Sequence, residues 1–152
     1  MYEAKLKEMG IELPEAPTPL AAYIPAIVAG EFAFTSGQIP MAEGELKYKG
    51  KVGSDLTEEQ GYEASRLCAI NCLSALKTVI TDLDRVEKIV KVTGFVNSAP
   101  GFTAQPKVIN GASEFFGEVF GEAGKHARAA VGVSELPIDA AVEVEIIVKV
   151  KK

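Results

Sequence analysis

Residues 127–151 constrain the fold most strongly, because they alternate between apolar and small or polar residues in two runs separated by the break at 134–141. Alternation with period two is typical of β-strands, since successive side chains point to opposite faces. Two such runs around one short break predict a hairpin or a close strand pair. One face of the second run carries only valine and isoleucine, and the other carries Glu143 and Glu145.

Arg128 lies on the small-residue face of the first run, beside Ala130 and Gly132. If the apolar faces of the two strands are coplanar, Arg128 and Glu143 project from the same side of one sheet. An arginine among small residues with a carboxylate nearby favours an anion-binding site. The alternative is a surface ion pair, which contributes about 0–1 kcal/mol to stability.

The rest of the chain predicts an element order of β-β-β-α-β-α-β-β. The capping-box residues Thr57 and Gln60 mark the start of the first long helix. Each long helix carries one apolar stripe, so both are expected on one face of a single mixed sheet of about six strands, an α+β two-layer sandwich. The expected strands are 26–29, 32–36, 46–52, 88–96 and the two runs above, and the expected long helices are 57–82 and 105–120.

Residues 1–20 are expected to form a short helix followed by a proline-rich extended arm, ahead of a single domain at 21–152. Helices on one face leave the other sheet face without a cover from this chain. That face is expected to carry Arg128, Ala130, Glu143 and Glu145, with the apolar Phe95 and Ile147. Such a face predicts burial against another subunit, with the anion site at the subunit boundary.

Composition excludes several classes of function. The net charge of −5 disfavours nucleic-acid binding, which needs many lysines and arginines to neutralise phosphates. With one histidine, and with Cys68 and Cys72 placed on an apolar helix stripe, we expect no metal site and no cofactor. No apolar run approaches the roughly 20 residues that span a bilayer. The first nine residues lack the apolar core of a secretion signal, so we expect a cytoplasmic protein.

Three motifs, in this order, resemble the YjgF/RidA family of reactive-intermediate deaminases, also called L-PSP endoribonucleases. They are Gly30 with the 34–40 segment Phe-Thr-Ser-Gly-Gln-Ile-Pro, the 89–93 segment Ile-Val-Lys-Val-Thr, and Ala127-Arg128 followed by Leu136-Pro137 and the 142–145 segment Val-Glu-Val-Glu. The resemblance covers residues 20–150, and the length is similar to that of a longer subgroup. It implies a chorismate-mutase-like fold and a homotrimer with three clefts between neighbouring subunits.

The resemblance also implies roles for individual residues. Arg128 matches the arginine that clamps the carboxylate of an imine or enamine, and Glu143 matches the glutamate that positions water. Further residues match substrate-binding positions: Tyr23, Ser36, Gly37, Asn110 and Ala130. Asn110 fits with a spacing to Arg128 one residue longer than usual, and Ala130 stands where a cysteine is common. His126 stands where proline is frequent, which alters the pocket wall.

The leading interpretation is a deaminase that hydrolyses 2-aminoacrylate-type intermediates to 2-keto acids and ammonia. A noncatalytic protein that binds a small carboxylate and regulates or protects another protein is the alternative, since that role also needs Arg128. Ribonuclease activity is a third reading, which the acidic composition disfavours.

Overall fold

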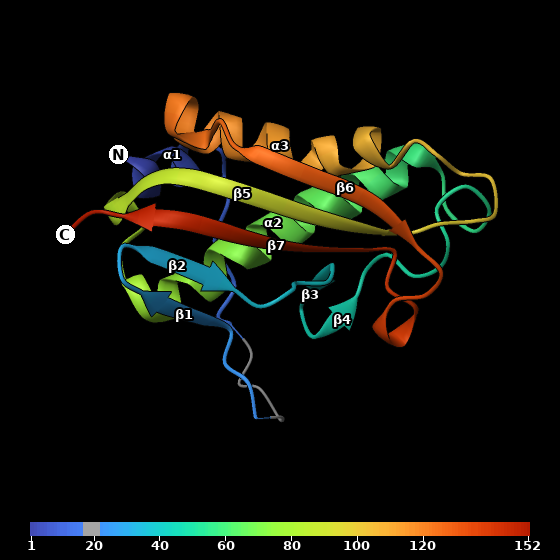
Figure 1. Ribbon diagram of the computed structural model, residues 1–152, viewed down its shortest axis with the longest axis horizontal. Helices are drawn as coiled ribbons and strands as arrows, with labels where there is room; N and C mark the ends of the chain where they lie inside the picture. The colour runs from blue at the N-terminus through green and yellow to red at the C-terminus, as the bar shows by residue number, and fades with distance from the viewer. Residues whose placement is uncertain (17–21) are drawn as a thin grey trace.

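The computed structural model describes residues 1–16 and 22–152 and contains one principal sheet with helices on one side. Figure 1 shows the sheet in front, with the two long helices, α2 (Glu58–Ile80) and α3 (Gln105–Phe120), behind it. Only β5 and β6 are parallel neighbours in the sheet, and the other pairs are antiparallel. In spatial order the strands are β1 (Ala26–Ala29), β2 (Phe32–Thr35), β7 (Val142–Val150), β5 (Val86–Asn97) and β6 (Ala127–Val133).

The sheet has five strands rather than the predicted six, because the strand predicted at 46–52 does not form. In its place β3 (Met41–Ala42) and β4 (Glu45–Leu46) form a separate two-stranded sheet, and the following residues make only isolated bridges. Gly50 and Gly53 adopt φ values of +114° and +103°, which interrupt an extended strand. The alternating lysines therefore lie in a loop.

The predicted helices are confirmed, and so is their position on one face. Thr57 and Gln60 make the reciprocal capping box that starts α2. α2 and α3 approach closely at Gly111, where an added Cβ would overlap the carbonyl oxygen of Tyr62. The expected apolar stripe of α3 is buried in full: Val108, Ile109, Ala112, Phe115, Phe116, Val119 and Phe120.

Two buried thiols join the helical layer to the sheet. Cys68 and Cys72 are fully buried on α2 and lie 3.5 and 3.3 Å from the carbonyl oxygens of Val142 and Val144. Burial raises the pKa of both thiols. They therefore act as small core residues, as predicted.

The apolar alternation of β5 is interrupted near its start. Ile89 and Val92 are buried, and Val90 is not, because the pairing with β7 shifts register between Ile89 and Lys91. The extra residue of such a bulge has no partner and turns away from the regular alternation. Val90 therefore does not join Ile89 and Val92 in the core.

The N-terminal helix is confirmed as α1 (Tyr2–Glu8), and it packs on the helical layer. Leu6 is buried, and the ring of Tyr2 lies 4.6 Å from that of Phe120. Asp84, in the short 3-10 helix η1 (Leu83–Arg85), accepts hydrogen bonds from the first backbone N–H groups of α1. The expected boundary between arm and domain, at residues 20–21, lies outside the described residues.

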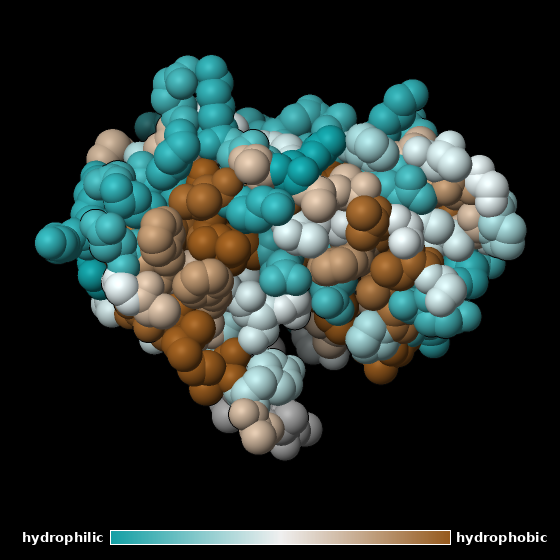
Figure 2. Space-filling model, in the orientation of Figure 1, coloured by the Kyte–Doolittle hydropathy of each residue, from teal (hydrophilic) through white to brown (hydrophobic). Residues whose placement is uncertain are grey.

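The second face of the sheet is covered by none of the described helices, and it is partly apolar. The strand registers place Phe34 beside Ile147 and Phe95 beside Glu143 on this open face. Figure 2 shows hydrophobic residues gathered over β1, β2 and the adjoining part of β7. Phe34 is 37% exposed and Ile27 is 52% exposed. The expectation of an uncovered face with apolar members is confirmed.

Candidate functional site

Arg128 and Glu143 do not project from the same side of the sheet, so that prediction is wrong. β5 lies between β6 and β7, which therefore form no hairpin. Arg128 pairs with Val92, which is buried under the helices, whereas Glu143 pairs with Phe95 on the open face. The sequence argument assumed that the Ala-Val face of β6 joins the core. The small-residue face of β6 is the one that lies toward α3.

Arg128 is held along α3 by three hydrogen bonds. Nη1 donates to Asn110 Oδ1 at 2.8 Å and to Ser113 Oγ at 3.1 Å, and Nη2 donates to the Pro106 carbonyl oxygen at 3.4 Å. The structure thus brings Arg128 and Asn110 together, as the resemblance implies. Ala130 follows on the same face, opposite Gly94.

The direction of these bonds leaves one edge of the guanidinium open to a ligand. A guanidinium has five N–H groups in a fixed fork, and both hydrogens of Nη1 are engaged by α3. Within the described part of the chain, Nε and the second hydrogen of Nη2 make no hydrogen bond. Nε–H and an Nη2–H are parallel, so this edge fits a carboxylate in two hydrogen bonds.

Ser113 and His126 complete this group of residues, which we call the Arg128 cluster: Asn110, Ser113, His126, Arg128 and Ala130. Ser113 Oγ lies 2.9 Å from His126 Nε2. Sequence reasoning missed Ser113 and treated His126 only as a change in the pocket wall. The one signal was spacing, since Ser113 lies one turn after Asn110 on the same helix face.

A second group of residues, the Glu143 cluster, lies at the end of β2: Ser36, Gly37 and Glu143. Gln38 pairs with Val144 through two backbone hydrogen bonds, which holds Gly37 against Glu143. A Cβ on Gly37 would lie 2.8 Å from Glu143 Cδ, so a larger residue at this position would displace the carboxylate end of Glu143.

Ser36 is fixed by backbone contacts to the segment that precedes β1, and Tyr23 of that segment is exposed. Ser36 Oγ donates to the Ile24 carbonyl oxygen at 2.6 Å, and Ser36 N–H donates to the Pro25 carbonyl oxygen at 2.8 Å. Tyr23 precedes β1 and is 58% exposed. Ser36 therefore ties the segment after Tyr23 to the end of β2.

Glu143 has a carboxyl group of raised pKa. Partial burial is the larger cause, and the charge of Glu145 on the same strand face adds to it. No described side chain makes an ion pair or hydrogen bond with this carboxylate. Arg128 of the same chain lies on the other face of the sheet and does not pair with it.

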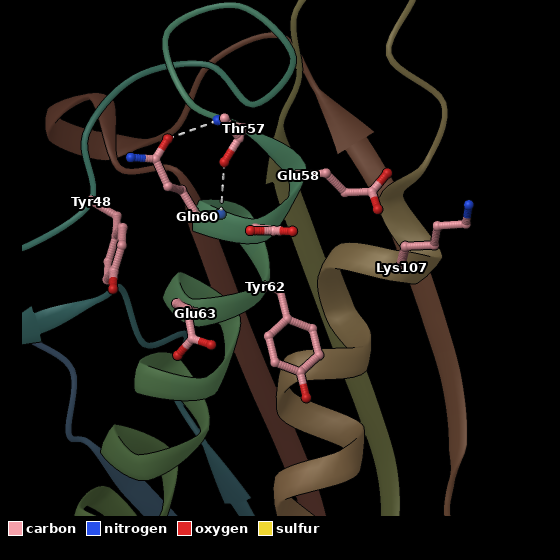
Figure 3. Close-up of a pocket in the computed structure, with 8 residues that line it drawn as sticks. Tyr48, Thr57, Glu58, Gln60, Tyr62, Glu63 and Lys107 are labelled. Carbon is pink, nitrogen blue, oxygen red and sulfur yellow. Dashed lines mark hydrogen bonds between the residues drawn. The ribbon is translucent and has the colours of Figure 1, made fainter.

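A surface pocket of about 440 Å³ lies elsewhere, at the start of α2 (Figure 3). Its lining includes none of the predicted site residues. Three glutamates make it unsuitable for a carboxylate, and the side chains of Thr57 and Gln60 are already engaged in the capping box. The lining residues are Tyr48, Thr57, Glu58, Glu59, Gln60, Tyr62, Glu63 and Lys107.

The described residues contain neither a metal-binding group of side chains nor a membrane-spanning helix. Among residues 1–16 and 22–152, no three His, Cys, Asp or Glu side chains come together in a way that could hold a metal ion. In the same part of the chain, no helix combines the length and the apolar character that crossing a membrane requires.

Comparison with known proteins identifies the family. Residues 3–150 match the family described as "YjgF/chorismate mutase-like, putative endoribonuclease". Protein TCP17 of Trypanosoma cruzi is 44% identical over 147 residues, which are 96% of this chain and 92% of that protein. The crystal structure of Atu1372 from Agrobacterium tumefaciens superposes with a TM-score of 0.92 at 42% identity, covering 99% of this chain and 92% of that one. The chain therefore belongs to the YjgF/RidA family.

Two more distant relatives carry functional descriptions. The 2-iminobutanoate/2-iminopropanoate deaminase of Dermatophagoides farinae is 30% identical over 141 residues, which are 93% of this chain and 95% of that protein. The structure of Escherichia coli TdcF with bound serine has a TM-score of 0.65 at 25% identity, covering 91% of this chain and 94% of that one.

Proposed function

We propose that this protein hydrolyses imines and enamines that carry a carboxylate, giving 2-keto acids and ammonia. One observation carries the proposal: α3 holds Nη1 of Arg128 and leaves the Nε–Nη2 edge for a carboxylate. The deaminase and the serine-bound TdcF among the relatives support a small ligand with a carboxylate. We also propose the cytoplasm as the compartment of this protein, as expected from its sequence.

The chemistry needs a positioned water and a proton transfer. Arg128 holds the substrate carboxylate, which brings the imine carbon to a fixed place. Glu143 accepts a proton from water as the water oxygen bonds to that carbon, and it passes this proton to the imine nitrogen, which gives a carbinolamine. Glu143 then moves the hydroxyl proton of the carbinolamine to the nitrogen. The C–N bond breaks as the C=O bond forms, and ammonia leaves the keto acid. Burial raises the pKa of Glu143, which makes its carboxylate a stronger base.

Arg128 and Glu143 lie on opposite faces of one sheet, so we propose that a working site combines Arg128 of one subunit with Glu143 of its neighbour. The partly apolar open face supports burial against other copies, and a homotrimer is the closed arrangement that the family resemblance implies. In that assembly Arg128 would supply the cation that Glu143 lacks within one chain, and Ser36 and Gly37 would line the same cleft.

The same geometry gives a second candidate function, a noncatalytic carboxylate-binding protein. The Arg128 cluster is complete within one chain and could bind a keto acid without Glu143. Ribonuclease activity has less support, because the chain is acidic and contains only three arginines.

A coupled assay tests the proposal. A serine dehydratase generates 2-aminoacrylate, and pyruvate release is followed with and without this protein. Acceleration that is lost in Arg128→Ala supports the deaminase. Arg66→Ala is the matched control, because it removes an arginine that pairs with Glu118 on the outer helical layer. Pyruvate binding without acceleration favours the noncatalytic protein.

A further inference from the structure

Ser113 and His126 link Arg128 to the protein backbone. Arg128 Nη1 donates to Ser113 Oγ at 3.1 Å, and Ser113 Oγ lies 2.9 Å from His126 Nε2. His126 Nδ1 lies 2.6 Å from the carbonyl oxygen of Gly124. The imidazole is half-buried and meets the ring of Phe116 edge-on. A continuous chain of contacts thus runs from the backbone to the guanidinium.

The chemistry of the groups gives each contact a single direction. A carbonyl oxygen only accepts, so His126 Nδ1 carries a hydrogen and donates it to Gly124. Burial and then the charge of Arg128 lower the pKa of His126, so the ring is neutral at pH 7 and Nε2 accepts. The Ser113 hydroxyl therefore donates to Nε2, and its oxygen accepts from Arg128.

We propose that Ser113 and His126 are positioning residues that hold the guanidinium of Arg128 for carboxylate binding. The proposal rests on the proposed function, because it takes Arg128 as the carboxylate clamp. Arginine has several rotatable bonds, and a ligand that had to order them would bind more weakly. The bonds from Nη1 to Asn110 and Ser113 fix the plane of the guanidinium before the ligand arrives.

A serine beside a histidine that is itself oriented is also the arrangement of a nucleophile and its base. Arg128 donates to the same Ser113 oxygen and withdraws electron density from it, which makes it a poorer nucleophile. The contacts therefore favour the positioning role.

The tautomer of His126 can be observed directly. It is the only histidine in the chain, so nitrogen-15 labelling of histidine in the untagged protein gives one imidazole spin system. We expect hydrogen on Nδ1 and none on Nε2 at neutral pH. We also expect the Nε2 resonance to move when 2-ketobutyrate is added to the wild type. A ring with hydrogen on Nε2, or a charged ring, would overturn the proposal.

Binding of 2-ketobutyrate, measured by calorimetry, tests the function of the chain of contacts. Ser113→Ala and His126→Phe should each weaken binding about tenfold, which is about 1.4 kcal/mol. His126→Phe keeps the aromatic contact with Phe116. His126→Gln supplies an oxygen that can accept the Ser113 hydroxyl, and it should restore binding to within about threefold of the wild type. Ser113→Thr should do the same.

The outcomes separate this proposal from the proposed function. If Arg128→Ala binds 2-ketobutyrate as the wild type does, or if the wild type does not bind it, both proposals fail. If Arg128→Ala loses binding while Ser113→Ala and His126→Phe keep it, only the positioning role fails. In the deaminase assay Ser113→Ala should raise KM with little change in kcat, because the clamp acts on substrate and transition state alike.

Discussion

The Arg128 cluster and the Glu143 cluster are held together by different interactions. Side-chain hydrogen bonds from α3 fix Arg128, and they are all formed within one chain. Glu143 is placed by its strand and by the close approach of Gly37, and no described residue neutralises its charge. One cluster is thus ready for an anion, whereas the other is a partly desolvated carboxylate.

Under the proposed function, a single copy of the chain would not make a complete site. A desolvated carboxylate is costly without a cation nearby. A guanidinium with an open edge lies on the opposite face of the same sheet. A second copy that brings its open face to the β6 edge beside Arg128 would satisfy both groups, which links the proposed chemistry to assembly.

Mixing two inactive variants is the strongest test of this link. Arg128→Ala and Glu143→Gln should each lower kcat/KM by about 100-fold or more, the scale of a lost general base. Random trimers refolded from equal amounts of the two should recover about a quarter of the wild-type sites, because each site then draws one intact residue from each neighbour. A mixture that stays inactive would place both residues of a site in one chain.

The open face offers the next test. Phe34→Glu places a charge among apolar residues next to Ile147, and we expect it to dissociate the oligomer and abolish deaminase activity. Sedimentation velocity measures the mass. The control is Val28→Glu, which lies on the helix-side face of the neighbouring strand and is 45% exposed. An unchanged mass in Phe34→Glu would mean that this face is not the interface.

Gly37→Ala acts directly on the carboxylate of Glu143. The added Cβ would displace the Glu143 carboxylate, and we expect kcat to fall about tenfold to 100-fold while 2-ketobutyrate binding at Arg128 changes little. Gly117→Ala is the control, because no atom lies within 4 Å of its added Cβ. That variant should gain about 0.5–1 kcal/mol in the free energy of unfolding and keep its activity. Equal losses of kcat in both variants would contradict the role given to Gly37.

The local features of this fold are readable from the sequence. The capping box of Thr57 and Gln60, the stripe of α3 and the alternation of β7 each depend on residues a few positions apart. The strands that pair with β6 cannot be predicted from such neighbouring residues. β5 pairs with both β6 and β7 and separates them, and only tertiary packing determines that arrangement.

The site shows the same limit. The resemblance assigns both Arg128 and Asn110 to substrate binding, which stays a prediction, and the structure shows that the two side chains contact each other. The prediction of the sheet face on which Arg128 lies was wrong. The small residues of β6 lie toward α3, and its Ala-Val face is the open one. Ser113 escaped notice because its function depends on His126, which approaches from a different element.

The smallest expected effect is a shift in the pH profile. Glu143 must be ionised to act as the base, so kcat should fall on acidification as its carboxylate takes up a proton, and the charge of Glu145 raises the pKa at which this happens. Glu145→Gln removes the second cause of the shift, so the acid limb should move to lower pH while the partial burial of Glu143 remains. Stopped-flow measurement of kcat between about pH 4 and pH 8 resolves this limb. The control is Glu87→Gln, whose carboxylate pairs with Lys149 instead. An acid limb that stays in place in Glu145→Gln would show that another group limits catalysis, and the base would then have to be sought outside the Glu143 cluster.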